Sequence, residues 1–149
     1  PEIRSPFATR PWQHVLEPLS GYISLICALN ENIALNGETF NFGPPTNQNH
    51  TVEELVNEII DHWPGSEWVD KSAENKAPHE AGLLQLNCDK ALQTLGWQAT
   101  LNFKETAKWT ADWYRGYYEK SPAATVEITS KQINNYMELA KVRNSFKLN

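Results

Sequence analysis

Three segments of the chain carry the polar pattern that begins a helix, and each is followed by apolar residues at helical spacing. In this pattern Thr or Asn is followed three positions later by Glu or Gln, and the two side chains bond the free backbone N–H groups of the first turn. The pairs are Thr51 with Glu54, Asn102 with Glu105, and Thr129 with Gln132. The sequence therefore predicts helices over 52–63, over 102–118 and from 129 onward.

Two further helices are predicted from cap and periodicity signals. One begins at Glu17, because Pro18 suits a first turn, whose N–H groups lack helical partners in any case. Segment 30–36 should end it. A short helix over 89–95 is expected to close at Gly96, which favours a left-handed cap. The first of these helices keeps one apolar face, formed by Leu16, Leu19, Ile23 and Ile26.

Strands are expected to be few and short. Prolines favour extended structure over 1–15, residues 38–42 have the alternation of a strand, and 67–69 suggests a second. Residues 71–80 are predicted to form a polar loop over a ligand site, and 83–86 an extended segment. The expected fold class is α/β, mostly helical with a few short strands, in one domain over 1–149 whose last part, from about 121, is a helical extension.

Composition excludes several classes of partner. The formal charge is -5 with a pI near 5.4 and no lysine cluster, which argues against a nucleic-acid or membrane-surface footprint. No stretch approaches the ~20 apolar residues of a membrane span. Cys27 and Cys88 have none of the paired spacings of zinc or redox sites, and the histidines have no metal-ligand spacing, so we assign no metal. These features favour a cytoplasmic protein with reduced cysteines.

The glycines exclude a dinucleotide site within this chain. A Rossmann fingerprint needs closely spaced glycines where a strand turns into a helix. The seven glycines are widely separated, at positions 21, 37, 43, 65, 82, 96 and 116. No tyrosine is followed four positions later by lysine, so a catalytic Tyr-x-x-x-Lys motif is also missing.

Several short motifs follow one another along the chain: Arg10-Pro11-Trp12-Gln13-His14-Val15-Leu16-Glu17, then 38–43, Pro78-His79-Glu80-Ala81, Lys90-Ala91 and Leu95-Gly96-Trp97. In this order they resemble the extended short-chain dehydrogenase/reductase superfamily. The first motif narrows the resemblance to the CDP-glucose 4,6-dehydratases within it. The resemblance implies that these residues are the C-terminal, substrate-binding part of such an enzyme, with the Rossmann domain absent.

The resemblance also implies an activity for the parent enzyme. In this family bound NAD takes hydride from the sugar C4, water leaves across C5 and C6, and the hydride returns to C6. The product, a CDP-4-keto-6-deoxyglucose, feeds deoxysugars of bacterial surface polysaccharide. NAD and the catalytic residues would belong to the N-terminal Rossmann domain, so we expect no catalytic residue, no bound cofactor and no activity in this chain alone. The parent is expected to be a homo-oligomer.

Four residues are candidates for substrate binding by the same resemblance. Arg10 matches the arginine that grips the diphosphate, and a charged, forked donor suits two phosphates. Asn47, shifted by one residue, matches an asparagine that contacts the substrate in related dehydratases, with Asn49 as the alternative. Lys76 stands where relatives have an arginine, and His79 where they have a histidine facing the diphosphate and sugar. The neighbouring Trp12 and His14 are expected to pack rather than to bind ligand.

Two alternatives remain open from the sequence. The base-reading residues are not identifiable, so an epimerase or dehydratase acting on UDP-, GDP- or dTDP-sugars is one of them. The other is a non-catalytic binding or assembly module that contacts a partner through the aromatic-rich helix 102–118. Its aromatic residues, Trp109, Trp113, Tyr114, Tyr117 and Tyr118, have helical spacing, which favours core or subunit packing over carbohydrate stacking.

Overall fold

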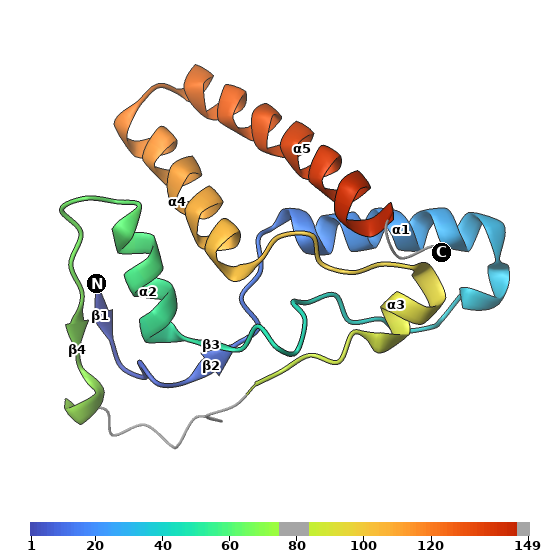
Figure 1. Ribbon diagram of the computed structural model, residues 1–149, viewed down its shortest axis with the longest axis horizontal. Helices are drawn as coiled ribbons and strands as arrows, with labels where there is room; N and C mark the ends of the chain where they lie inside the picture. Colours follow the sequence, from blue (N-terminus) through green and yellow to red (C-terminus); the bar gives the residue numbers. More distant parts are fainter. Residues whose placement is uncertain (75–83, 146–149) are drawn as a thin grey trace.

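The computed structural model describes residues 1–74 and 84–145, and it shows a mostly helical molecule with two small strand pairs (Figure 1). Five α-helices occur in these ranges, together with 3-10 turns at Ile33–Leu35 and Ser72–Glu74. The helices are α1 (Leu16–Glu31), α2 (Val52–Asp61), α3 (Asp89–Leu95), α4 (Phe103–Glu119) and α5 (Pro122–Ser145). The expected fold class, mostly helical with few strands, is confirmed.

The predicted capping boxes set the starts of α2 and α4. The Thr51 hydroxyl accepts from the Glu54 backbone N–H at 3.1 Å, and the Glu54 carboxylate accepts from the Thr51 N–H at 2.6 Å. Asn102 and Glu105 make the same two bonds, each at 2.9 Å. At the C-terminal end of α3, Gly96 adopts a left-handed φ of 65°, as expected for a glycine cap.

The prediction that the last helix begins at Thr129 is wrong, because α5 begins at Pro122. Proline fits a first helical position, and the Ser121 hydroxyl before it accepts from the Ala124 N–H at 3.3 Å. Thr129 lies inside the helix, where its hydroxyl donates to the Thr125 carbonyl and accepts from the Trp113 indole N–H, each at 2.8 Å. It joins α5 to α4 rather than starting a helix.

The strands pair only locally. β1 (Glu2–Ile3) lies parallel to β4 (Val69–Asp70), and β2 (Thr9–Arg10) lies antiparallel to β3 (His50–Thr51). The predicted strand over 38–42 is wrong: this segment is not in a strand, because no neighbour forms a ladder with it in the described part of the chain. The other expected strand, 67–69, is shifted to β4.

The main core cluster lies where α1, α3 and segment 38–42 meet. Phe42, Ala91 and Trp97 are its buried members, and the rings of Phe42 and Trp97 pack edge to face with centroids 4.9 Å apart. Gly21 allows α1 to lie close against the Phe42 ring, since a Cβ at this position would lie 2.4 Å from the ring. α4 and α5 form a helical hairpin, and α1 passes beside the C-terminal part of α5 (Figure 1).

The predicted apolar face of α1 points outward. Ile23 and Ile26 are 63% and 66% exposed, and Val15, Leu19 and Tyr22 are exposed beside them. The buried residues of this helix are instead Glu17 and Gly21. In α4 the aromatic residues divide: Trp109 and Trp113 are half-buried, while the three tyrosines are exposed. None of the described helices combines the length and apolar character that a membrane crossing requires.

Candidate functional site: the Arg10 segment and the loop beside it

Arg10 lies on β2, directly opposite His50 on β3. Its side chain is half-buried, and its Nη1 donates to the carbonyl oxygen of Thr9 at 2.7 Å. The strand pair therefore brings Arg10 beside the chain that leads into α2. The predicted diphosphate-binding arginine and the loop that carries Asn47 thus belong to one neighbourhood.

Two side chains after Arg10 bond this segment to distant parts of the chain. The Trp12 indole N–H donates to the His50 carbonyl at 3.0 Å, next to the strand pair. The Gln13 amide donates to the Phe42 carbonyl at 3.0 Å, just before Gly43 begins the loop. These bonds hold both ends of segment 43–50 against residues 10–17, which we call the Arg10 segment. They therefore fix the position of Arg10 relative to the loop.

His14 is a core histidine, as expected. It is 5% exposed, its Nδ1 accepts from the Leu16 N–H at 3.3 Å, and its ring packs edge-on to that of Trp109. Burial lowers the pKa of His14, because water no longer solvates the charged imidazolium. A neutral ring is the form that accepts at Nδ1, so geometry and electrostatics agree on a packing role.

Glu17 is the last residue of the Arg10 segment, and its role as a buried hydrogen-bond acceptor was not predicted from the sequence. The carboxylate is only 1% exposed, and it accepts from the backbone N–H groups of Thr100 and Leu101 and from the Tyr136 hydroxyl at 2.7 Å. Burial raises the pKa of Glu17 in spite of these bonds. A glutamate within an otherwise apolar helix start was the available signal, since buried carboxylates occur only with such partners.

The same network involves the neighbouring hydroxyl and indole groups. The Ser20 hydroxyl accepts from the Trp97 indole N–H at 2.8 Å and lies 2.9 Å from the Tyr136 hydroxyl. Burial raises the pKa of Tyr136 to about 12, so its hydroxyl stays protonated and donates to Glu17. The Arg10 segment is therefore joined to α5 and to the loop before α4.

The structure describes only part of the remaining set of predicted substrate-binding residues. Asn47 is exposed on the loop, while Asn49, the alternative, lines a shallow groove together with Pro11 and the chain at Leu84. This groove has a volume of about 10 Å³, far below the ~300 Å³ and above of typical ligand pockets. Lys76 and His79 lie outside the described residues. Around Arg10, the described residues thus position a cation beside a polar loop, and the groove there is too small to hold a nucleotide sugar.

Comparison with known proteins agrees with the sequence motifs. No family model matches the chain. The CDP-glucose 4,6-dehydratase of Salmonella typhimurium is 43% identical over 119 residues, which cover 76% of this chain and 33% of the relative. The resemblance to the CDP-glucose 4,6-dehydratases is confirmed. The chain spans about a third of the length of this dehydratase.

Proposed function

We propose that this chain is the substrate-binding lobe of an NAD-dependent CDP-glucose 4,6-dehydratase, which converts CDP-glucose to CDP-4-keto-6-deoxyglucose and water. The observation that carries the proposal is the 43% identity to a dehydratase of that name. The cytoplasmic location, homo-oligomeric parent and role in bacterial surface polysaccharide are part of the same proposal, because the resemblance implies them together.

Arg10 is the residue that we assign to the diphosphate. Its place on β2 supports this, because Trp12 and Gln13 bond the flanking backbone and restrict how Arg10 can move relative to the loop. A positioned guanidinium loses less freedom on binding than a free side chain, and its planar fork can bridge two phosphate groups. Asn47, Lys76 and His79 are assigned to the same substrate by resemblance.

We assign the nicotinamide cofactor to another lobe, since the residues that the structure describes do not fit it. The described strands form only two separate pairs of two-residue strands, and the described glycines are far apart in the sequence. A dinucleotide site needs a wider parallel sheet and a glycine-rich turn. The part that this chain contributes would be to hold the nucleotide and sugar in register with the cofactor, and we propose that it is inactive alone.

The outward apolar face of α1 supports the presence of a partner lobe in the whole enzyme. Leu19, Ile23 and Ile26 are exposed on successive turns of one helix, although burying each would release roughly 1.5–3 kcal/mol of hydrophobic free energy. Contiguous exposed apolar patches mark interaction surfaces. We infer that the Rossmann lobe covers this face.

Calorimetric titration of the chain with CDP-glucose, beside dTDP-glucose, tests the assignment. We expect CDP-selective binding that Arg10→Ala weakens at least tenfold, which is about 1.4 kcal/mol. Arg10→Lys should give an intermediate affinity, because it keeps the charge and loses the fork. The matched control is Arg4→Ala, which removes an exposed arginine six residues before Arg10 and should leave the affinity unchanged.

Equal affinity for both sugar nucleotides would contradict the CDP-glucose assignment. Binding that is insensitive to Arg10→Ala would show that the diphosphate lies elsewhere. If no sugar nucleotide binds, the substrate-lobe proposal fails for this chain, and the assembly-module alternative becomes the better account.

A further inference from the structure

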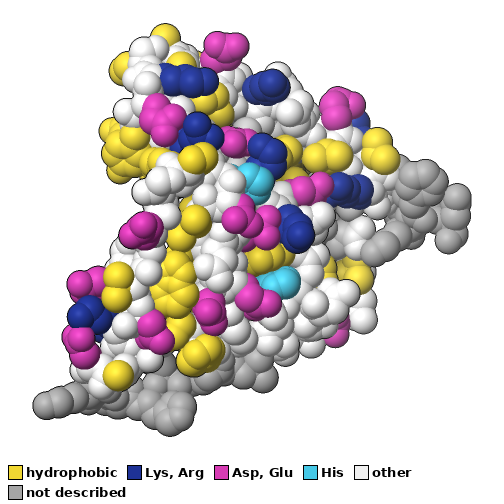
Figure 2. All heavy atoms as spheres, turned by 60° about the vertical axis from the view of Figure 1, so that its left-hand side comes forward, with side chains coloured by type: hydrophobic (Ala, Val, Ile, Leu, Met, Phe, Trp, Pro, Cys, Tyr) yellow, Lys and Arg dark blue, Asp and Glu magenta, His cyan; other side chains and the backbone are white. Residues whose placement is uncertain are grey.

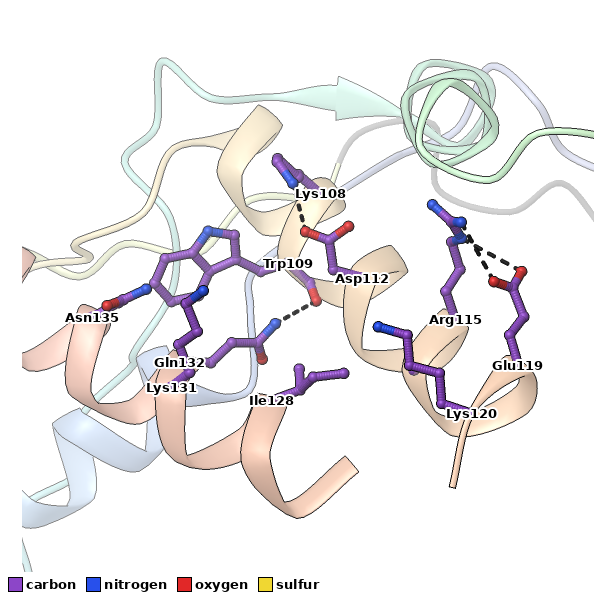
Figure 3. Close-up of a pocket in the computed structure, with 11 residues that line it drawn as sticks. Lys108, Trp109, Asp112, Arg115, Glu119, Lys120, Ile128, Lys131, Gln132 and Asn135 are labelled. Atoms are coloured by element: carbon purple, nitrogen blue, oxygen red, sulfur yellow. Dashed lines mark hydrogen bonds and ion pairs between the residues drawn. The ribbon is translucent and has the colours of Figure 1, made fainter. Parts of the chain in front are cut away.

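A groove lies between α4 and α5, apart from the Arg10 segment. The helices approach closely at Gly116, where a Cβ would lie 2.2 Å from the Cδ1 of Ile128. Most of the lining residues are long and polar, with Trp109 and Ile128 among them, and the open groove has a volume of about 420 Å³ (Figure 3). This volume falls within the ~300–1,000 Å³ of small-molecule sites.

The lining carries an excess of positive charge. Its two carboxylates already have partners on α4: Asp112 accepts from Lys108 at 2.5 Å, and Glu119 pairs with Arg115 at 3.4 Å. Two more cations line the same groove, Lys120 at the end of α4 and Lys131 on α5. In the described part of the chain neither of these lysines has an ion-pair partner. An incoming anion would therefore not have to displace a carboxylate to reach them.

The positive charge of this groove contrasts with the negative net charge of the whole chain. The formal net charge is -5, yet Figure 2 shows most of the visible Lys and Arg side chains in the upper part of the view, over α4 and α5, where Asp and Glu side chains lie among them. The lower part, around α2 and β4, carries mostly Asp and Glu. A locally positive groove on an acidic protein favours a small anion and disfavours a long polyanion, which the surrounding carboxylates would repel.

The remaining lining residues suit a ligand with hydroxyl groups. Gln132 and Asn135 line the wall formed by α5, and the Gln132 amide donates to the Trp109 carbonyl at 2.7 Å (Figure 3). The paired carboxylates of Asp112 and Glu119 still have lone pairs that accept from hydroxyls. In Figure 3 the ammonium group of Lys120 is directed toward the middle of the groove.

We propose that the groove between α4 and α5 is a binding site for a small phosphorylated polyol, with Lys120 and Lys131 holding the phosphate monoester. The phosphate carries close to two negative charges near neutral pH, which matches Lys120 and Lys131, the two lysines of the lining that have no ion-pair partner among the described residues. In Figure 3 these two side chains reach the groove from opposite sides, so both would turn inward onto the phosphate. The amides and carboxylates of the groove bond the hydroxyl groups. This site shares no residue with the Arg10 segment, so it is independent of the proposed nucleotide-sugar site.

Titration of the isotope-labelled chain with glucose 1-phosphate, inorganic phosphate and glucose, followed by NMR amide shifts, tests the site. We expect glucose 1-phosphate to shift the amides of Lys131, Gln132 and Asn135 with a Kd on the order of 1 mM. The double variant Lys120→Gln/Lys131→Gln should weaken this binding at least tenfold. Its melting temperature should stay the same, because both lysines are exposed.

Two matched controls separate the groove from other sites. Lys141→Gln removes an exposed lysine of α5 that pairs with Glu138 outside the groove, and it should leave the Kd unchanged. Arg10→Ala should also leave it unchanged. Absence of binding, binding unaffected by the double variant, or equal affinity for inorganic phosphate and glucose 1-phosphate would each overturn the proposal.

Discussion

At the residue scale, Glu17 shows how one buried side chain connects segments that are far apart in the sequence. Its carboxylate receives the backbone N–H groups of Thr100 and Leu101, just before α4, and the Tyr136 hydroxyl from α5. Close to this point Arg143 donates to the Thr100 carbonyl at 2.6 Å and forms two bonds to Glu105. The start of α1, the start of α4 and the later part of α5 therefore meet around one carboxylate.

Glu17→Ala is expected to lower the free energy of unfolding by about 3 kcal/mol, because it leaves buried backbone donors without an acceptor. Urea unfolding followed by circular dichroism measures the change. Glu138→Ala is the matched control, since Glu138 is exposed on α5 and pairs only with Lys141 among the described residues; it should stay within about 0.5 kcal/mol of the parent chain. Equal effects of the two changes would contradict the role of Glu17.

The raised pKa of Glu17 should also be visible in the pH dependence of the free energy of unfolding. Its folded-state pKa is raised above 4.5 by burial, so the folded chain holds that proton more tightly than the unfolded chain does. Its contribution to the free energy of unfolding therefore increases as the pH falls through the raised pKa toward 4.5. Glu17→Gln removes this titration. The stability difference between parent and variant should shift in favour of the parent as the pH is lowered from 7, whereas a pH-independent difference would argue against a raised pKa.

Subtracting the variant is necessary because other carboxylates act in the opposite direction. Hydrogen bonds from Arg143 hold the pKa of Glu105 below its usual value. Glu105 therefore contributes stability above its ordinary pKa of 4.5, and this stability is lost as the pH falls through the lowered pKa. That loss occurs equally in the parent and in Glu17→Gln, so it cancels in the difference.

At the element scale, two glycines inside helices serve packing rather than flexibility. Gly21 in α1 faces the flat ring of Phe42, and Gly116 in α4 faces the end of the Ile128 side chain. Both positions bring neighbouring elements close. The neighbours differ in their ability to move, since a ring held between Tyr22 and Trp97 cannot turn away, whereas a terminal methyl group rotates.

Gly21→Ala should destabilise the chain by about 2 kcal/mol, because overpacking against Phe42 outweighs the roughly 1 kcal/mol that alanine adds in helix propensity. Gly116→Ala is the comparison, and it should cost clearly less. Thermal unfolding of the two variants under one condition gives the test. A Gly21→Ala variant that is as stable as the parent would mean that α1 does not pack on Phe42 as closely as 2.4 Å implies.

At the scale of the whole molecule, the main feature is the uncovered apolar face of α1. Ile23 and Ile26 point away from the core cluster, which is instead reached by Leu25 on the same helix. The two faces of α1 therefore differ: one packs against the rest of the chain through Gly21 and Glu17, and the other is apolar and exposed. A second lobe on that face would leave both faces of α1 covered.

The double change Ile23→Lys/Ile26→Lys should alter the free energy of unfolding by no more than about 0.5 kcal/mol, as surface substitutions usually do. It should also reduce the fluorescence of a hydrophobic dye bound to the chain. Leu101→Lys, at a buried position, is the control and should abolish folding. Marked destabilisation by the α1 changes would contradict an exposed face.

Local residue patterns were enough to predict the features that depend only on neighbouring residues. The starts of α2 and α4 follow from Thr51 and Asn102, whose side chains bond backbone groups three residues away, and the end of α3 follows from the backbone freedom of Gly96. The family resemblance also came from short motifs. These features need no knowledge of the rest of the chain and were predicted correctly. The equally local Thr129–Gln132 pattern misplaced the start of α5, because Thr129 lies inside that helix.

Which surfaces are covered and which polar groups are paired depends on how distant segments pack together. Residues 38–42 have the pattern of a strand, but a strand needs a neighbouring backbone, and Phe42 bonds the Gln13 side chain instead. The apolar stripe of α1 was visible in the sequence, yet its direction depends on where α3 and α5 lie. Glu17 is buried because donors more than eighty residues away reach it. These outcomes depend on contacts between distant segments, which local patterns do not specify.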